Sequence, residues 1–146
     1  MPVKTEAVGK TYPPVVYAVG REKIREYANA TGETNPVCLD PMSARAAGYA
    51  DVVAPPMFAV VYSAPAVGPA ILDPDVAINF ASMVHGGQDF VWGPPVVAGD
   101  EITTTATVMT PVAAQLKKRC LVDIVSSPIT RLDWPIHIIT TMMGTE

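Results

Sequence analysis

The sequence predicts an α+β fold in which an antiparallel sheet wraps around one long buried helix. Two features support this prediction. From about Met57 the chain is hydrophobic almost all round a helical projection, as expected for a helix covered on most sides. After Asp75 the pattern changes to period-two alternation, and further strand-like segments follow. Helices followed by a run of strands are typical of α+β proteins.

The first elements are expected to be a short extended segment and an amphipathic helix. Residues 15–19 favour an extended backbone, and Gly20 precedes a helix over about 21–31. Within that helix Ile24, Tyr27, Ala28 and Thr31 recur at helical spacing and predict one buried stripe. The charged residues between them predict a solvated face.

A turn-rich loop is expected over residues 31–40. Asn35 and Asp40 each precede a proline, which disfavours the helical region for the residue before it. We expect the Asn35 side chain to close this turn and the Asp40 side chain to cap a short helix over about 42–47. Gly48 should end that helix.

The central helix is expected to follow an extended segment that ends in two prolines. Proline is tolerated in the first turn of a helix, so Pro55-Pro56 can lead directly into a helix from about Met57. Pro65 should kink or end it. We predict that this helix is fully buried.

The remaining residues predict four long strands. The first runs from about Asp75 to Trp92, and the Gly86-Gly87 pair indicates a bulge that shifts its register. Residues 93–100 form a turn. Three more strands are expected over 101–110, 116–130 and 135–143, the last two joined at 131–134.

The composition limits the classes of function. The length of 146 residues fits a single domain, 1–146, and 49 % hydrophobic residues exclude a disordered chain. A net charge of −4 without a basic face argues against nucleic-acid binding. The apolar stretches are too short for a membrane span, and the N-terminus lacks the apolar core of a secretory signal. The sequence therefore predicts a cytoplasmic protein with no membrane association.

Further composition bears on cofactors and partners. Two histidines without grouped carboxylates predict no metal site, and the absence of a glycine-rich phosphate loop predicts no nucleotide, so we expect no cofactor. Cys38 and Cys120 are expected to be reduced thiols. Only 16 % of residues are charged, against roughly 25 % in typical soluble domains. Such a chain exposes much uncharged surface, which often marks an interface.

Several segments resemble a known family. Residues 31–41, Thr-Gly-Glu-Thr-Asn-Pro-Val-Cys-Leu-Asp-Pro, are similar to the loop S/T-G-D-x-N-P-x-H-x-D-P of MaoC-like, R-specific enoyl-thioester hydratases and dehydratases. The similarity continues through 44–49 and 53–58. Residues 84–90 and 97–100 resemble the V-H-G-E-Q-x-F and L-x-A-G-D signatures of that family's N-terminal dehydratase-type domains. The resemblance covers roughly residues 8–108. It implies a dimeric hot-dog fold and substrates that are acyl chains on coenzyme A or acyl carrier protein.

The resemblance also identifies the positions that carry chemistry. The family adds or removes water across a trans-2,3 double bond with an aspartate and a histidine. Here these positions hold Glu33 and Cys38. The extra methylene of Glu33 moves its oxygens by about 1 Å or more, a scale to which catalytic geometry is sensitive. The usual thiol pKa of about 8.5 and the weak donor strength of a thiol do not suit Cys38 to replace histidine as a proton shuttle.

Other family positions are expected to bind substrate. They correspond to Asn35, Pro56, Met57, His85 and Gln88. Pro56 stands where the family has an oxyanion donor but carries no N–H, which leaves the Met57 N–H as an alternative donor. Each polar candidate also has a structural alternative. Asn35 would close its turn, Glu33 would face solvent, Cys38 would be a small buried hydrophobe, and His85 would be satisfied within its strand.

Three hypotheses of function follow. The altered positions, the proline before the central helix and the H-G-x-Q strand resemble the non-catalytic partner in heterodimeric (3R)-hydroxyacyl dehydratases, where another hot-dog subunit supplies Asp and His. Alternatively, the chain is a homodimeric hydratase or specialised-metabolite enzyme that uses Glu33 with a bound water. The third hypothesis is a non-catalytic protein that binds a small ligand. In the dimeric cases the low charge predicts sheets joined edge to edge.

Overall fold

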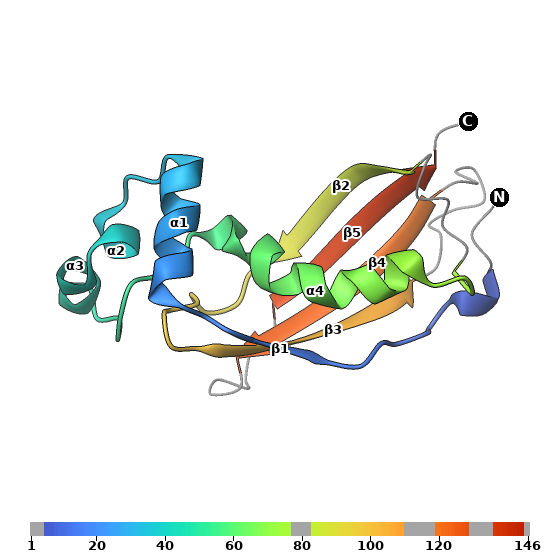
Figure 1. Cartoon of the computed structure of the whole chain (residues 1–146), viewed down its shortest axis with the longest axis horizontal. Helices are drawn as coiled ribbons and strands as arrows, with labels where there is room; N and C mark the ends of the chain where they lie inside the picture. The colour runs from blue at the N-terminus through green and yellow to red at the C-terminus, as the bar shows by residue number, and fades with distance from the viewer. Residues whose placement is uncertain (1–4, 77–82, 110–118, 129–135, 145–146) are drawn as a thin grey trace.

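The computed structural model describes residues 5–76, 83–109, 119–128 and 136–144, and only the backbone of 83–86 and of the last two ranges. A five-stranded antiparallel sheet lies against helix α4 (Ala59–Leu72), and three smaller helices gather beyond one end of it (Figure 1). The strands are β1 (Val15–Ala18), β2 (Met83–Val91), β3 (Glu101–Met109), β4 (Arg119–Pro128) and β5 (Ile136–Gly144). Their order in the sheet is β1-β3-β4-β5-β2. The predicted antiparallel sheet on a long helix is confirmed.

Helix α1 (Arg21–Thr31) has the bounds that its pattern predicts. Gly20 is extended at its start, and Gly32 closes its end in the left-handed region with φ of 68°, which glycine adopts without steric cost. Ile24 and Ala28 are fully buried, whereas the charged residues between them face solvent. Tyr27 is half-buried and packs against the core, whereas Thr31 is exposed, so the predicted stripe is confirmed for its first three residues and wrong at Thr31.

The expected loop over 31–40 contains a helical turn, α2 (Pro36–Leu39), so the prediction of an irregular segment is wrong there. Pro36 sits in the first turn, where its missing N–H costs no hydrogen bond. The Asn35 side chain accepts from Val37 N at 3.2 Å. Asp40 stays extended and caps α3 (Pro41–Ala46) by accepting from Ser43 N at 2.9 Å. Both predicted side-chain roles, closing the turn and capping the helix, are confirmed.

Helix α4 differs from its prediction in two respects. It follows a 3₁₀ turn over Pro56–Phe58 and continues through Pro65 and Pro69 to Leu72, so Pro65 does not end it. Both inner prolines are exposed, while the opposite face of the helix packs into the core. The helix is also not fully buried, since Leu72 is 73 % exposed. A single sheet covers only one side of it.

The strands bring distant residues into register. The pairing of β2 with β5 shifts between His85 and Gly87, which confirms the predicted bulge. Val76 lies in a turn rather than in a strand, while the predicted strand residues 77–82 and the connection over 131–134 fall outside the described residues. In β3 the side chains of Ile102, Thr104, Ala106 and Val108 are buried in strict alternation.

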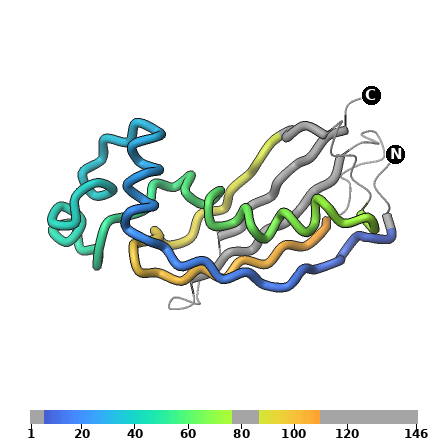
Figure 2. Tube along the Cα trace, in the orientation of Figure 1, coloured from blue at the N-terminus to red at the C-terminus, as the bar shows by residue number. Residues whose placement is uncertain are grey.

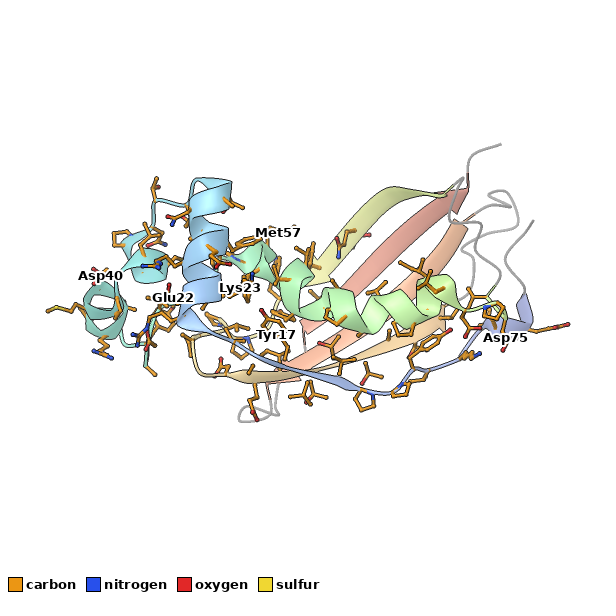
Figure 3. The ribbon with its side chains drawn as sticks, viewed as in Figure 1. Tyr17, Glu22, Lys23, Asp40, Met57 and Asp75 are labelled. Carbon is orange, nitrogen blue, oxygen red and sulfur yellow. The ribbon has the colours of Figure 1, made fainter. Side chains whose placement is uncertain are left out.

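The main core is centred on aromatic rings. Phe58 is fully buried, and the rings of Tyr17, Tyr27 and Tyr62 meet it edge-on with centroids 6.4, 5.5 and 6.2 Å away. Such pairs add to the stability gained by burying their area. Figure 3 shows side chains from α4 and β1 filling the space between helix and sheet. This core fixes the start of α4.

A second, smaller cluster joins the three-helix end to the sheet. It consists of Cys38, Val53 and Val97, with Val37 and Tyr49 packed against it. Val53 also forms an isolated bridge with Val97, and its N–H donates to Val37 O at 3.0 Å. The segment that carries α2 is therefore tied to the sheet through both backbone and side chains.

The N-terminal segment runs back along the far end of α4 (Figure 2). There the Tyr12 hydroxyl donates to Asp73 at 2.7 Å, and Lys10 Nζ lies 2.6 Å from the same carboxylate. Hydrogen bonds from Lys10 and Tyr12 lower the pKa of Asp73 to about 2. These contacts fasten the end of the helix. Among the described residues, no helix has both the length and the apolar character needed to cross a lipid bilayer.

Candidate functional site

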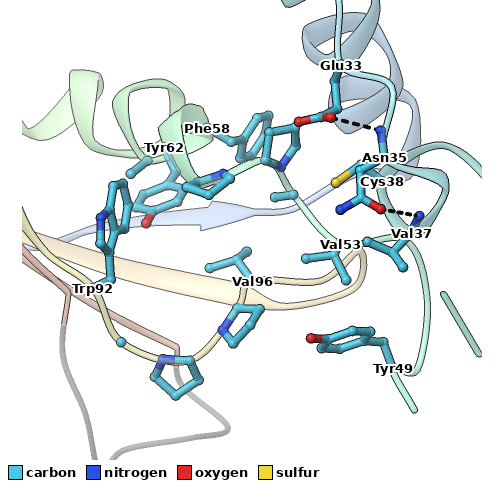
Figure 4. A pocket seen from close by; sticks show the side chains of 17 residues that line it. Glu33, Asn35, Val37, Cys38, Tyr49, Val53, Phe58, Tyr62, Trp92 and Val96 are labelled. Atoms are coloured by element: carbon cyan, nitrogen blue, oxygen red, sulfur yellow. Dashed lines mark hydrogen bonds between the residues drawn. The ribbon is translucent and has the colours of Figure 1, made fainter. Parts of the chain in front are cut away.

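A pocket of about 390 Å³ opens where α2, the start of α4 and the turn after β2 meet (Figure 4). Its wall comes from three stretches of chain, within residues 33–38, 53–62 and 92–96, and from Tyr49. Most of these side chains are apolar, and five of the lining residues are alanine or valine while four are proline. The pocket is therefore suited to a hydrocarbon chain.

Glu33 lines the pocket, and its carboxylate is engaged by its own turn. The left-handed Gly32 ends α1 and leads the chain into this turn, where Glu33 N donates to Ala28 O at 2.8 Å. Glu33 Oε1 accepts from the backbone N–H of Thr34 at 2.8 Å and from that of Asn35 at 2.9 Å, and Figure 4 shows the second of these bonds. The same oxygen thus satisfies two main-chain donors, which is the work of a structural acceptor.

Cys38 also lines the pocket, as part of the second cluster. Its side chain is 5 % exposed. Burial raises the pKa of the thiol, and the negative charge of Glu33 raises it further. The thiol is therefore protonated near neutral pH and is a poor nucleophile and a poor base.

The other predicted positions divide into two groups. Asn35 and Pro56 belong to the lining, whereas Met57, 45 % exposed, and Gln88 do not. The side chain of His85 lies outside the described residues. At the start of α4, Phe58 N donates to Pro55 O at 2.8 Å, and Met57 N–H precedes this first bond of the turn. The structure thus brings Glu33, Asn35, Cys38 and Pro56 together around one pocket.

Two prominent lining residues were not predicted. Tyr62 comes from α4 and is 1 % exposed. Trp92 follows β2, and its ring stacks on Phe90 with centroids 4.6 Å apart and planes 4° from parallel. A tyrosine hydroxyl in an otherwise apolar helix was the available signal for Tyr62. Trp92 had no such signal, because strand alternation assigned it to the sheet.

The lining carries little acid–base chemistry. Its groups able to exchange a proton are Glu33, Cys38, Tyr49 and Tyr62, and burial raises the pKa of Tyr62. No histidine, lysine or arginine occurs in the part of the lining that the structure describes. Nor do three side chains able to ligate a metal come together anywhere among the described residues. The pocket can enclose a ligand, but its described lining holds no imidazole, the side chain that most readily exchanges a proton near pH 7.

Comparison with known proteins is consistent with this geometry. The model of the family described as "FAS1-like, dehydratase domain region" matches residues 6–124. A UPF0336 protein of Clavibacter michiganensis is 53 % identical over 109 residues, which cover 74 % of this chain and 73 % of the relative.

Solved structures extend the similarity to nearly the whole chain. The HadBC (3R-hydroxyacyl-ACP dehydratase) complex of Mycobacterium tuberculosis contains a chain with a TM-score of 0.77 and 26 % identity, and the match covers 97 % of this chain and all of that one. A MaoC-like dehydratase has a TM-score of 0.80 and 26 % identity, with 94 % of this chain covered and 42 % of that chain. These matches confirm the hot-dog fold and the resemblance that the sequence motifs indicated.

Proposed function

Because this chain belongs to the FAS1-like dehydratase-domain family, whose fold it shares with MaoC-like hydratases and dehydratases, we propose that it is the accessory subunit of an R-specific 3-hydroxyacyl dehydratase. In this role it binds the acyl chain of a thioester on coenzyme A or acyl carrier protein. The observation that carries the proposal is the pocket itself. It is apolar, and at the family's two catalytic positions it holds a carboxylate engaged by its own turn and a buried thiol.

Hydration or dehydration requires two proton transfers. One group must take a proton while another delivers one, and each needs a pKa near the working pH. The raised pKa of Cys38 makes the thiol a poor base, and the Glu33 oxygen already accepts two backbone hydrogen bonds. We therefore assign both transfers to a partner hot-dog subunit that carries Asp and His.

The surface offers a place for such a partner. In the described sheet β2 lies at one edge, paired with β5 only, and such an edge can add a strand from another chain. Val91 at the end of β2 is 57 % exposed, and Leu72 on the outer face of α4 is 73 % exposed. Covering both would bury apolar surface and continue the sheet. The matched HadBC structure is itself a complex.

The test combines this chain with a catalytic candidate. The chain is co-expressed with a hot-dog protein encoded beside it in its own genome, and hydration of crotonyl-coenzyme A is measured for each protein alone and for the pair. The pair should be faster than the partner alone, while this chain alone should be inactive. Equal rates with and without this chain would refute the accessory role. Turnover by this chain alone, abolished by Glu33→Gln, would favour the homodimeric enzyme.

A further inference from the structure

The Tyr62 hydroxyl is a buried polar group in the wall of the pocket. Tyr62 is 1 % exposed and lines the pocket. No residue that the structure describes makes a hydrogen bond to its hydroxyl, and burial alone accounts for the rise of its pKa. Figure 4 shows the ring extending from α4 with its oxygen between Trp92 and Val96. The hydroxyl therefore lies at the pocket, between two other lining residues.

Such an arrangement is costly without a ligand. Buried hydroxyls in native proteins are almost always hydrogen-bonded, and an unbonded one loses the hydrogen bonds it had with water. A phenylalanine at this position would make the same edge-on contact with Phe58, at 6.2 Å between centroids, without this loss. A molecule that enters the pocket can supply the missing partner.

The surroundings limit the chemistry of that molecule. In Figure 4 Tyr62 and Trp92 stand at one end of the lining, and Glu33, Asn35 and Cys38 stand at the other. The described lining holds no positively charged side chain that could pair with a carboxylate of the ligand. Its one carboxylate, Glu33, lies at the end away from Tyr62. A neutral oxygen, carried on an otherwise apolar chain, meets both conditions.

We propose that the Tyr62 hydroxyl donates a hydrogen bond to a neutral oxygen of the bound acyl chain, a hydroxyl or a carbonyl, and so selects oxygenated chains over plain ones. This inference rests on the proposed function, since it assumes that the pocket receives an acyl thioester. Trp92, held by its stack on Phe90, forms the wall beside this donor. Tyr62 is thus a specificity-determining residue and takes no part in proton transfer.

The test compares binding of three thioesters to the oligomer in which the chain is isolated. Dissociation constants of hexanoyl-, 3-hydroxyhexanoyl- and 5-hydroxyhexanoyl-coenzyme A are measured by calorimetry for the native protein, Tyr62→Phe and Tyr27→Phe. The control also loses a hydroxyl next to Phe58, where the Tyr27 ring centroid lies at 5.5 Å, but Tyr27 is not in the lining. The native protein should prefer at least one hydroxylated chain, and Tyr62→Phe should reduce that preference roughly two- to tenfold. Tyr27→Phe should leave it unchanged.

Two outcomes overturn the inference alone. In one, the native protein binds the three thioesters but Tyr62→Phe leaves their ratios unchanged, as it would if only water met the hydroxyl. In the other, the ligand-free Tyr62→Phe protein melts at a lower temperature than the native protein, because the hydroxyl then has a partner within the protein. If the native protein binds none of the three thioesters, the proposed function fails and this inference fails with it.

Discussion

Replacing Glu33 distinguishes a structural carboxylate from a catalytic one. Its Oε1 accepts from Thr34 N at 2.8 Å and Asn35 N at 2.9 Å. A side chain that accepts from backbone N–H groups in this way stabilises a protein by about 0.5–2 kcal/mol, and a charged acceptor is roughly twice as strong as a neutral one. Since the residue is half-buried, water replaces part of what is lost. Glu33→Ala should therefore lower the free energy of unfolding by about 1–2 kcal/mol, and Glu33→Gln by about half as much.

The two properties are measured on the same variants. Urea unfolding gives the stability, and hydration of crotonyl-coenzyme A by the complex with the partner gives kcat. For Glu33→Gln we expect kcat within about threefold of the native value, whereas removal of a general base costs roughly 10²–10⁴-fold. The matched control is Glu26→Gln on the exposed face of α1, where the carboxylate pairs with Lys23 at 2.8 Å; because an exposed ion pair contributes little, it should change stability only slightly and leave kcat unchanged. A 100-fold loss of kcat in Glu33→Gln with unchanged stability would show that the carboxylate is catalytic.

Three further predictions concern the core, the thiol and the dependence on pH. Phe58→Ala should lower the free energy of unfolding by about 3–5 kcal/mol in urea, and Phe58→Leu by less than half of that; equal losses would contradict the central role of this ring. In a Cys120→Ser background, Cys38 should react with a thiol reagent far more slowly in the native protein than in urea, because burial raises its pKa; similar rates would exclude a buried thiol. A hydrogen bond from Lys10 is the main cause that lowers the pKa of Asp73 to about 2. The ionised carboxylate therefore contributes its full stability above the unfolded pKa near 4, and this contribution is lost as the pH falls toward 2. Between pH 4 and pH 2.5 the urea midpoint of unfolding should therefore decrease less for Asp73→Asn than for the native protein. An equal decrease would refute this linkage.

Local signals in the sequence predicted the elements whose conformation is decided locally. Helix α1 begins after Gly20 and ends before Gly32. The amphipathic pattern of residues 21–31 and the left-handed glycine that follows both favour these ends. Asp40 caps α3 because its carboxylate can reach the backbone N–H groups of Met42 and Ser43, two and three residues later. In each case the determining contacts lie within a few residues of one another.

Helix α4 shows where local signals fail. Proline disfavours a helix by a local loss of one hydrogen bond and a local clash, and this predicts an end at Pro65. The helix continues because its other face is packed into the core, with Tyr62, Ala66 and Ala70 buried one turn apart. That compensation comes from the sheet, which is distant in sequence. The exposed outer face could not be predicted either. The sequence of the helix is apolar on all sides, and this pattern does not show which sides the rest of the protein covers.

The site divides in the same way. Glu33, Asn35 and Cys38 could be located from the sequence because one short loop carries all three in a recognisable motif. Tyr62 and Trp92 could not, because their membership of the pocket depends on how α4 and the turn after β2 approach each other. The motif located the end of the pocket that holds Glu33, Asn35 and Cys38, and the tertiary structure added the end that holds Tyr62 and Trp92.

Helix α4 links the two proposals, because it has a part in both. One face carries Ala59 and Tyr62 to the pocket, and the other presents Pro65, Pro69 and Leu72 to solvent. Close-packed interiors transmit displacement, so a subunit that covers the outer face also restrains the position of the pocket wall. The partner would thus supply the proton-transfer groups and hold the Tyr62 donor in place. An accessory subunit of this kind would bind its acyl chain most selectively when the catalytic subunit is present. The substrate would then be selected in the same complex that carries the proton-transfer groups.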